Sequence, residues 1–351
     1  MFSRDSKTKY LAFALTMTVL LTACGGGGGN TSSTPPPPTV FSEYDLTGAT
    51  NPVHDPSVIR QNGTYYVFGT DIGTPVNGSL PILCSGDRVA WSACGYVFSQ
   101  VPHWVTTQVP GVVGLWAPDI SYFNGLYHVY YAGSTFGSNL SVIGLATNST
   151  LDPTDPTYEW VDQGEVLSST TADDFNAIDP NILADTDGSV WLTYGSFWSG
   201  IKQQQIDPTT GFLLASNPNV YSLATRPNVP ADPVEAASLV HQGSYYYLFV
   251  SFDYCCNTDP YQDTYRIMVG RGSSPNGPFT DMNGTAMMQG GGTQLLAGNG
   301  TSWSGPGGQT AYLDSQNGDI IVFHAIQLPD GAPYLFVNSL TWPNNWPQIQ
   351  P

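Results

Sequence analysis

A pattern of residues that returns five times along the chain constrains its fold more than any other feature. Each copy has a short acidic or glycine-proline motif, an apolar strand, a turn pair and an aromatic strand. The turn pairs are Asn62-Gly63, Asn124-Gly125, Asp187-Gly188, Gln242-Gly243 and Asn317-Gly318. Asn-Gly and Asp-Gly pairs between alternating apolar segments are a strong hairpin signal, because these residues tolerate positive φ. The sequence therefore predicts five β-hairpins.

The spacing of the copies indicates how the hairpins are arranged. The leading acids of the first four copies, Asp55, Asp119, Asp179 and Glu235, lie 64, 60 and 56 residues apart. This period suits a four-stranded blade with its loops and is too long for one coil of a β-helix. No long segment has the 3.6-residue apolar period of a helix. We therefore predict an all-β, five-bladed β-propeller in which these acids occupy equivalent positions and meet at one mouth of the channel.

The start of the chain predicts export and lipidation. Basic residues precede an apolar run over 10–21, and Cys24 follows Leu21-Thr22-Ala23 as in a lipobox. We predict a lipoprotein signal peptide over 1–23, a Gly/Pro-rich flexible tether with lipidated Cys24 over 24–40, and the propeller over 41–351. The protein should be exported and anchored at the cell surface or outer membrane, contacting the membrane only through its lipid.

The net charge limits the possible partners of the protein, and the cysteine content indicates disulfide bonds. The chain has 9 basic and 27 acidic residues, a net charge of −18, which excludes nucleic acid because phosphate binding depends on Lys and Arg. Four cysteines follow Cys24, an even number that fits disulfides in an oxidising compartment. Cys84 and Cys94 flank a short loop and can pair. Cys255 and Cys256 are adjacent, so they pair either with each other or outward.

A cluster of carboxylates in a cleft is costly and therefore points to function. Glycoside hydrolysis needs one neutral carboxyl group to protonate the leaving oxygen and one ionised group to activate water. A third ionised carboxylate nearby raises the pKa of the acid. Calcium binding is the alternative use of such a cluster. It is less favoured for the whole set because the acids come one per blade, although a single ion on the axis is compatible with them.

Several motifs resemble those of the arabinanases of glycoside hydrolase family 43, over nearly the whole mature domain. They are His54-Asp55-Pro56, Trp116-Ala117-Pro118-Asp119, Asn176-Ala177-Ile178-Asp179-Pro180, Gly195-Ser196-Phe197-Trp198, Val234-Glu235-Ala236, Cys255-Cys256 and the stretch 266–271. The resemblance implies a five-bladed propeller and inverting, endo-acting hydrolysis of α-1,5-linked arabinan. It also implies Asp55 as general base, Glu235 as general acid, and Asp179 as the residue that modulates the pKa of the acid and orients it.

The resemblance implies further roles. Substrate contacts are expected from five residues: His54, Trp116, Asn176, Ser196 and Phe197. Trp198 is either a sugar contact or part of the core, and Asp119 is expected to fix its loop by hydrogen bonds. His324 is implied as a ligand of one structural Ca²⁺ on the axis, with no organic cofactor. The chain departs from many arabinanases at Gly308-Gln309, where they have a histidine after Gly-Pro-Gly.

Other functions remain possible on the same scaffold. The same acids serve arabinofuranosidases and β-xylosidases, so arabinan or a related pentosan is the expected partner of a monomeric enzyme. A non-catalytic glycan-binding surface lipoprotein is the alternative of a different class. It would need aromatic platforms but no proton donor, so the presence of all three acids argues against it.

Overall fold

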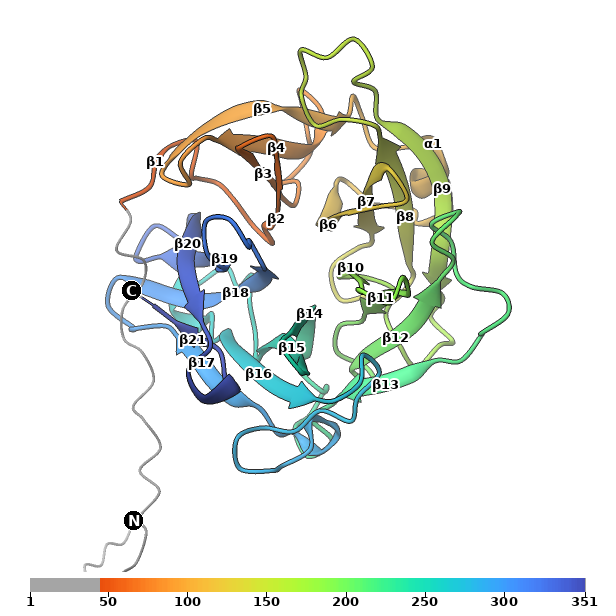
Figure 1. The fold of residues 1–351 in the computed structure, drawn as a ribbon. Helices are drawn as coiled ribbons and strands as arrows, with labels where there is room; N and C mark the ends of the chain where they lie inside the picture. Colours follow the sequence, from red (N-terminus) through yellow and green to blue (C-terminus); the bar gives the residue numbers. More distant parts are fainter. Residues whose placement is uncertain (1–44, 351) are drawn as a thin grey trace, which may run out of the picture. The chain divides into compact units, whose positions relative to one another are not determined.

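The structure is a computed structural model that describes residues 45–350 (Figure 1). Five sheets of consecutive strands are arranged around a central axis, and each has its first long strand innermost. The predicted all-β, five-bladed β-propeller is confirmed. The predicted signal peptide, lipidated Cys24 and tether lie outside the described residues. Within the described part of the chain, no helix has the length and apolarity needed to cross a membrane.

The strands of each blade follow the chain outward from the axis. Blade 1 contains β2 (Ser57–Gln61), β3 (Thr64–Phe68), β4 (Ser79–Ser85) and β5 (Ala90–Phe98), with β1 (Thr47–Gly48) parallel to β5 at its outer edge. Blade 2 contains β6 (Leu115–Phe123), β7 (Leu126–Gly133), β8 (Ser141–Asn148) and β9 (Val161–Ser169). Blade 3 contains β10 (Asn181–Ala184), β11 (Val190–Tyr194), β12 (Ile201–Ile206) and β13 (Tyr221–Ala224).

The last two blades repeat this order. Blade 4 contains β14 (Val234–Gln242), β15 (Tyr245–Phe252), β16 (Arg266–Gly272) and β17 (Thr293–Ala297). Blade 5 contains β18 (Trp303–Tyr312), β19 (Ile320–Gln327), β20 (Pro333–Thr341) and β21 (Gln348–Ile349). Short helices occupy connections: α1 (His103–Gln108), η1 (Pro260–Gln262), η2 (Met287–Gln289) and η3 (Pro343–Asn345).

The two innermost strands of every blade form the predicted antiparallel hairpin. In blade 1, both turn residues are left-handed, with φ of 49° at Asn62 and 91° at Gly63. In blade 2, Asn124 and Gly125 have φ of 48° and 79°. The backbone therefore uses the conformational tolerance for which these residue pairs are favoured in hairpins.

The apolar core is divided among the spaces between neighbouring blades. Five clusters of buried side chains each join two successive blades, and one of them joins blade 5 to blade 1. The segment before β2 adds backbone bonds to β20, from Val53 N to Pro333 O at 3.0 Å and from Leu335 N to Thr50 O at 2.9 Å. Because each sheet buries its faces against its neighbours, the ring must close for the blades to be stable.

Polar side chains on the inner strands also tie successive blades together. In each link an oxygen accepts a hydrogen bond from a backbone N–H of the next blade, at 2.8–3.1 Å. The links run from Ile120 to Ser57, from Ile182 to Asp119, from Leu239 to Asn181 and from Ala311 to Ser238. These four acceptors therefore hold equivalent positions in blades 1 to 4.

Candidate active site

A left-handed residue recurs at one end of every inner strand. Its φ is 46° at Asp55, 42° at Ala117, 54° at Asp179, 52° at Ala236 and 57° at Gly308. The strand pairing is also shifted at this point in blades 2, 4 and 5. Non-glycine residues rarely adopt this conformation, and bulges next to active sites re-aim side chains. The five residues line a cavity of about 30 Å³ on the axis, which marks this end as the candidate catalytic mouth.

The predicted equivalence of the four leading acids holds for Asp55 and Asp179 but is wrong for Asp119 and for Glu235, which lies one residue before the left-handed Ala236. Asp119 is the more displaced of the two. It lies two residues beyond the left-handed Ala117, in the frame of links between blades. Its carboxylate accepts from Asn181 Nδ2 at 2.8 Å as well as from the Ile182 N–H, and burial raises its pKa to about 7. These bonds agree with the structural role expected for Asp119.

Asp55 is held in its ionised form. Thr70 Oγ1 donates to its Oδ2 at 2.7 Å, and His54 Nδ1 lies 2.8 Å from the same oxygen. Burial alone would raise the pKa of Asp55, but the charge and hydrogen bond of His54, with smaller contributions from His324 and Thr70, lower it to about 2. A carboxylate in this state can accept a proton from water.

Glu235, in β14, has the opposite protonation. Its carboxyl group is buried and is contacted by the hydroxyl groups of Ser196 and Tyr265. Burial raises the pKa of Glu235 well above its usual value, and the charges of Asp179 and Asp55 add to this effect. Glu235 therefore keeps its proton under conditions in which Asp55 is ionised, which is the pairing that acid–base catalysis requires.

Asp179 connects the two groups electrostatically. Burial, followed by the charge of Asp55, raises the pKa of Asp179 to about 7, although the Ala236 N–H donates to its Oδ2 at 3.0 Å. Its charge in turn acts on Glu235. The structure thus brings together three carboxyl groups that are far apart in the sequence, as the repeat predicted. Their individual catalytic roles stay predictions.

Two of the predicted substrate contacts lie directly against these acids. Ser196 is buried and its Oγ donates to Glu235 Oε2. His54 is bonded to Asp55, and its ring stacks on that of His324 with centroids 3.7 Å apart. His324 Nδ1 accepts the backbone N–H of Asp55 at 3.1 Å. These contacts assign His54 and Ser196 a part in holding the acids, and direct contact with sugar stays a prediction for both.

The aromatic candidates differ in exposure. Phe197 is half-buried, and its ring lies 5.7 Å from that of Tyr254. Trp198 is 40% exposed, which removes the core alternative for this residue. Trp116 is half-buried beside the left-handed Ala117. Exposed aromatic rings at a mouth of this kind are suited to the apolar faces of sugars.

Asn176 is buried more deeply than a surface contact would be. Its Oδ1 accepts from Ser141 Oγ at 2.7 Å, and its Nδ2 reaches the Ser138 carbonyl only at 3.5 Å. The amide nitrogen thus retains donor capacity, and its predicted bond to a sugar hydroxyl group is untested by this geometry.

Tyr265 and Thr70 were missed by the sequence reasoning, although both contact a candidate catalytic acid. The consecutive glycines Gly307 and Gly308 in blade 5 indicated that other groups approach the backbone closely there, and Tyr265 is one of these groups. A Cβ atom at Gly307 would lie 2.3 Å from the Tyr265 ring, and one at Gly308 would lie 2.3 Å from Asp55 Oδ1. Glycine at these positions therefore leaves room for Tyr265 and Asp55 at the mouth.

A propeller that holds an ionised and a protonated carboxyl group at one mouth has the site of a glycoside hydrolase. The model of glycosyl hydrolases family 43 matches residues 49–347, and this chain belongs to that family. It is 42% identical to an extracellular endo-α-(1→5)-L-arabinanase of Bacillus subtilis over 86% of this chain and 88% of that protein. It is 37% identical to an extracellular exo-α-(1→5)-L-arabinofuranosidase of Cellvibrio japonicus, over 85% and 86% of the two chains.

A solved structure supports the same family assignment. The endo-arabinanase of Bacillus licheniformis matches with a TM-score of 0.77 and 43% identity, over 87% of this chain and 99% of that one.

Proposed function

We propose that this protein hydrolyses α-1,5-linked arabinan within the chain and inverts the anomeric configuration. The observation that carries the proposal is the grouping of three buried carboxyl groups at one mouth, where neighbouring groups lower the pKa of Asp55 and raise the pKa of Glu235 and Asp179. The similarity to arabinan-cleaving enzymes supports the choice of substrate. A non-catalytic glycan-binding role is not favoured, because binding alone has no use for a protonated acid opposite an ionised base.

Each acid has a defined task in this mechanism. Glu235 donates its proton to the glycosidic oxygen while Asp55 takes a proton from the water that attacks the opposite face of the sugar. Asp179 keeps Glu235 protonated through its negative charge. Since water attacks directly, no covalent glycosyl-enzyme forms, and the two reacting carboxyl groups need about 6.5–9.5 Å between them.

Product analysis on debranched arabinan, arabinoxylan and xylan tests this function. We expect arabinan to be cut first, with a rapid fall in viscosity and a mixture of oligosaccharides, because internal cleavage shortens chains from the start. Nuclear magnetic resonance of the first product should show inverted anomeric configuration. Release of a single short sugar from chain ends would instead assign an exo mode, and a retained anomer would exclude the proposed mechanism.

Asp179→Asn tests the role of the third acid. Removing its negative charge should lower the pKa of Glu235, because the ionised form of Glu235 is no longer repelled by Asp179. Glu235 must be protonated to act, so the alkaline limb of the kcat/KM profile should move to lower pH. The acid limb, which reports ionisation of Asp55, should not move upward. A pH profile of the variant with an unchanged alkaline limb would remove Asp179 from this role.

We also propose one calcium ion on the axis, held through His324. The buried Nε2 of His324 has no hydrogen-bond partner among residues 45–350, which supports an additional group at this point. Its Nδ1 accepts the Asp55 N–H, so the neutral ring carries its proton on Nε2. Direct binding of the ion by Nε2 would require the proton to be on Nδ1. With the proton on Nε2, His324 can instead donate a hydrogen bond to a water molecule that is bound to the ion.

Export, lipid anchoring and a monomeric state complete the proposal. Both arabinan-active relatives are extracellular proteins, which supports export of this one. Lipidation of Cys24 rests on the sequence of the first 24 residues alone.

A further inference from the structure

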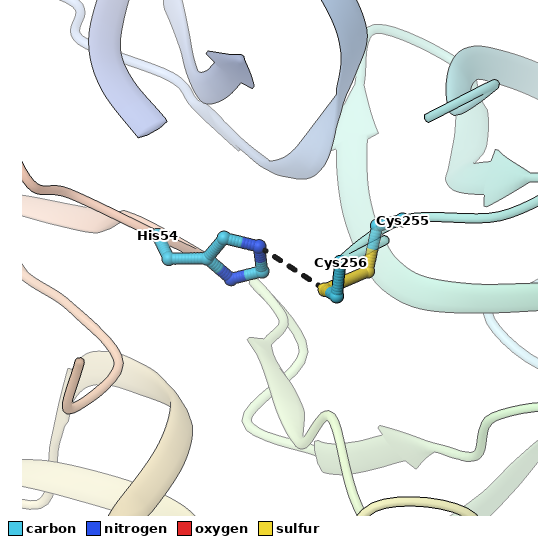
Figure 2. Close-up of side chains that lie close together, drawn as sticks. All are labelled: His54, Cys255 and Cys256. Atoms are coloured by element: carbon cyan, nitrogen blue, oxygen red, sulfur yellow. Dashed lines mark hydrogen bonds between the residues drawn. A yellow bond between two sulfur atoms is a disulfide. The ribbon is translucent and has the colours of Figure 1, made fainter. Parts of the chain in front are cut away.

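The adjacent cysteines Cys255 and Cys256 are joined to each other, which resolves the alternative that the sequence left open. They lie in the loop 253–265 between β15 and β16 of blade 4. Figure 2 shows the His54 ring, which comes from the segment before blade 1, pointing at this disulfide. His54 Nε2 is 3.5 Å from Cys256 Sγ. The loop therefore reaches from blade 4 to the side of the mouth that holds Asp55.

The same loop also borders the side of the mouth that holds Glu235. Tyr254, next to the disulfide, is 44% exposed, and its ring contacts that of Phe197. Phe197 directly follows Ser196, which is bonded to Glu235. The disulfide and Tyr254 thus lie between the contacts to the base and the contacts to the acid.

The loop is held firmly at both ends. Asp253 forms ion pairs with Arg226 at 2.6 Å and Arg266 at 2.7 Å. Farther along, Asp263 Oδ1 accepts from the backbone N–H and the side chain of Asn257 at 2.9 and 2.8 Å. A surface fixed in this way loses little conformational entropy when it binds a ligand.

Within the loop, the stretch 254–256 presents an apolar and polarisable surface. Cys256 is exposed and Cys255 half-buried, and a disulfide presents two sulfur atoms without an ionisable group. Sulfur atoms and aromatic rings make favourable contacts with apolar surfaces. The C–H faces of a furanose ring are such a surface. The position of the loop places this surface at the rim of a mouth that cuts glycosidic bonds.

We propose that the Cys255–Cys256 disulfide and Tyr254 form a binding subsite for one arabinofuranosyl unit of the polysaccharide. This inference rests on the proposed function, because it takes its ligand from the substrate of the same mouth. The subsite contributes binding that is equal in the ground state and the transition state, so its loss should raise KM and leave kcat nearly unchanged.

Steady-state kinetics on linear α-1,5-arabino-oligosaccharides test the subsite. In the double variant Cys255→Ser/Cys256→Ser and in Tyr254→Ala, we expect KM to rise about tenfold with kcat within about twofold of the parent. The matched control is Cys84→Ser/Cys94→Ser, which removes the disulfide that joins β4 to β5. Both kinetic constants should be unchanged in this control. Circular dichroism and thermal unfolding check that each variant is folded.

Reduction gives a second readout without changing the disulfide residues. In the Cys84→Ser/Cys94→Ser background, a water-soluble phosphine reduces Cys255–Cys256 to two thiols and is itself oxidised to the phosphine oxide, with the oxygen supplied by water. Thiol titration should show two new thiols, KM should rise, and reoxidation should restore it. If the double serine variant does not fold, Tyr254→Ala and this reduction still test the proposal.

The outcomes separate the subsite from the proposed function. If the unmodified protein does not cleave arabinan, the proposed function fails and the subsite fails with it. If it does cleave arabinan and KM is unchanged in Tyr254→Ala and after reduction, the subsite alone is excluded. A fall in kcat at constant KM would also overturn the subsite, because the disulfide would then act by positioning His54 and not by binding sugar.

Discussion

Asp55→Ala is expected to lower kcat on linear arabinan by about 10³–10⁴-fold, the upper range for loss of a general base. Asp55 is the one member of the three acids whose pKa is lowered, to about 2, so it is ionised at pH values at which Glu235 keeps its proton. Glu235 cannot replace it, because burial and neighbouring charges raise the pKa of Glu235 and keep that group protonated. The expected loss corresponds to about 4–5.5 kcal/mol of transition-state stabilisation.

Activation of water is needed whatever the leaving group, so the defect should be similar on arabinan and on an aryl arabinofuranoside. Asp185→Asn is a suitable control, because Asp185 is also a buried acid that follows an inner strand and is bonded to a histidine. Its kcat should stay within about twofold of the parent value. A variant of Asp55 that keeps a tenth of the parent activity would remove this residue from the role of base.

Glu235→Ala should be almost inactive on arabinan but much less impaired on substrates with an acidic leaving group. The sugar alcohol released from arabinan needs a proton, and we expect a loss of about 10³-fold or more. A dinitrophenolate leaves without a proton, so hydrolysis of the corresponding arabinofuranoside should fall by roughly tenfold or less. The measurement is kcat/KM across a series of aryl arabinofuranosides, in which the variant should depend steeply on the pKa of the leaving phenol.

The exposed Glu165, on β9, provides the matched control. Glu165→Ala should behave as the parent on every substrate. An equal loss on arabinan and on the dinitrophenyl substrate would show that Glu235 does not supply the proton.

Much of the architecture was predictable because its signals are local. Asn62-Gly63 and Asn124-Gly125 specify their turns through the conformational freedom of the turn residues themselves, and the structure has positive φ at all four. The period of the repeat then predicted the number of blades, and the motifs around Asp55, Asp179 and Glu235 predicted which acids meet.

The position of Asp119 shows where this reasoning stops. The sequence contains acids at nearly regular spacing, but the bulge between Trp116 and Asp119 changes which residue faces the mouth. Because the loops of the blades differ in length, the spacing between repeats cannot reveal that a residue lies one or two positions away from the equivalent residue of another blade. The motif around Asp119 predicted a structural role, and the hydrogen bonds from blade 3 show which groups Asp119 holds.

By itself, the sequence determined the hairpins, the propeller and the identity of the three acids, because turn chemistry and motifs act over short stretches of chain. The tertiary structure decided the protonation of those acids, since burial and neighbouring charges arise only when the ring of blades closes. It also decided that Tyr265 and Ser196 hold Glu235, that Cys255 pairs with Cys256, and that this disulfide faces His54. These contacts join residues from different strands and loops or choose among several possible partners, and no local pattern encodes either.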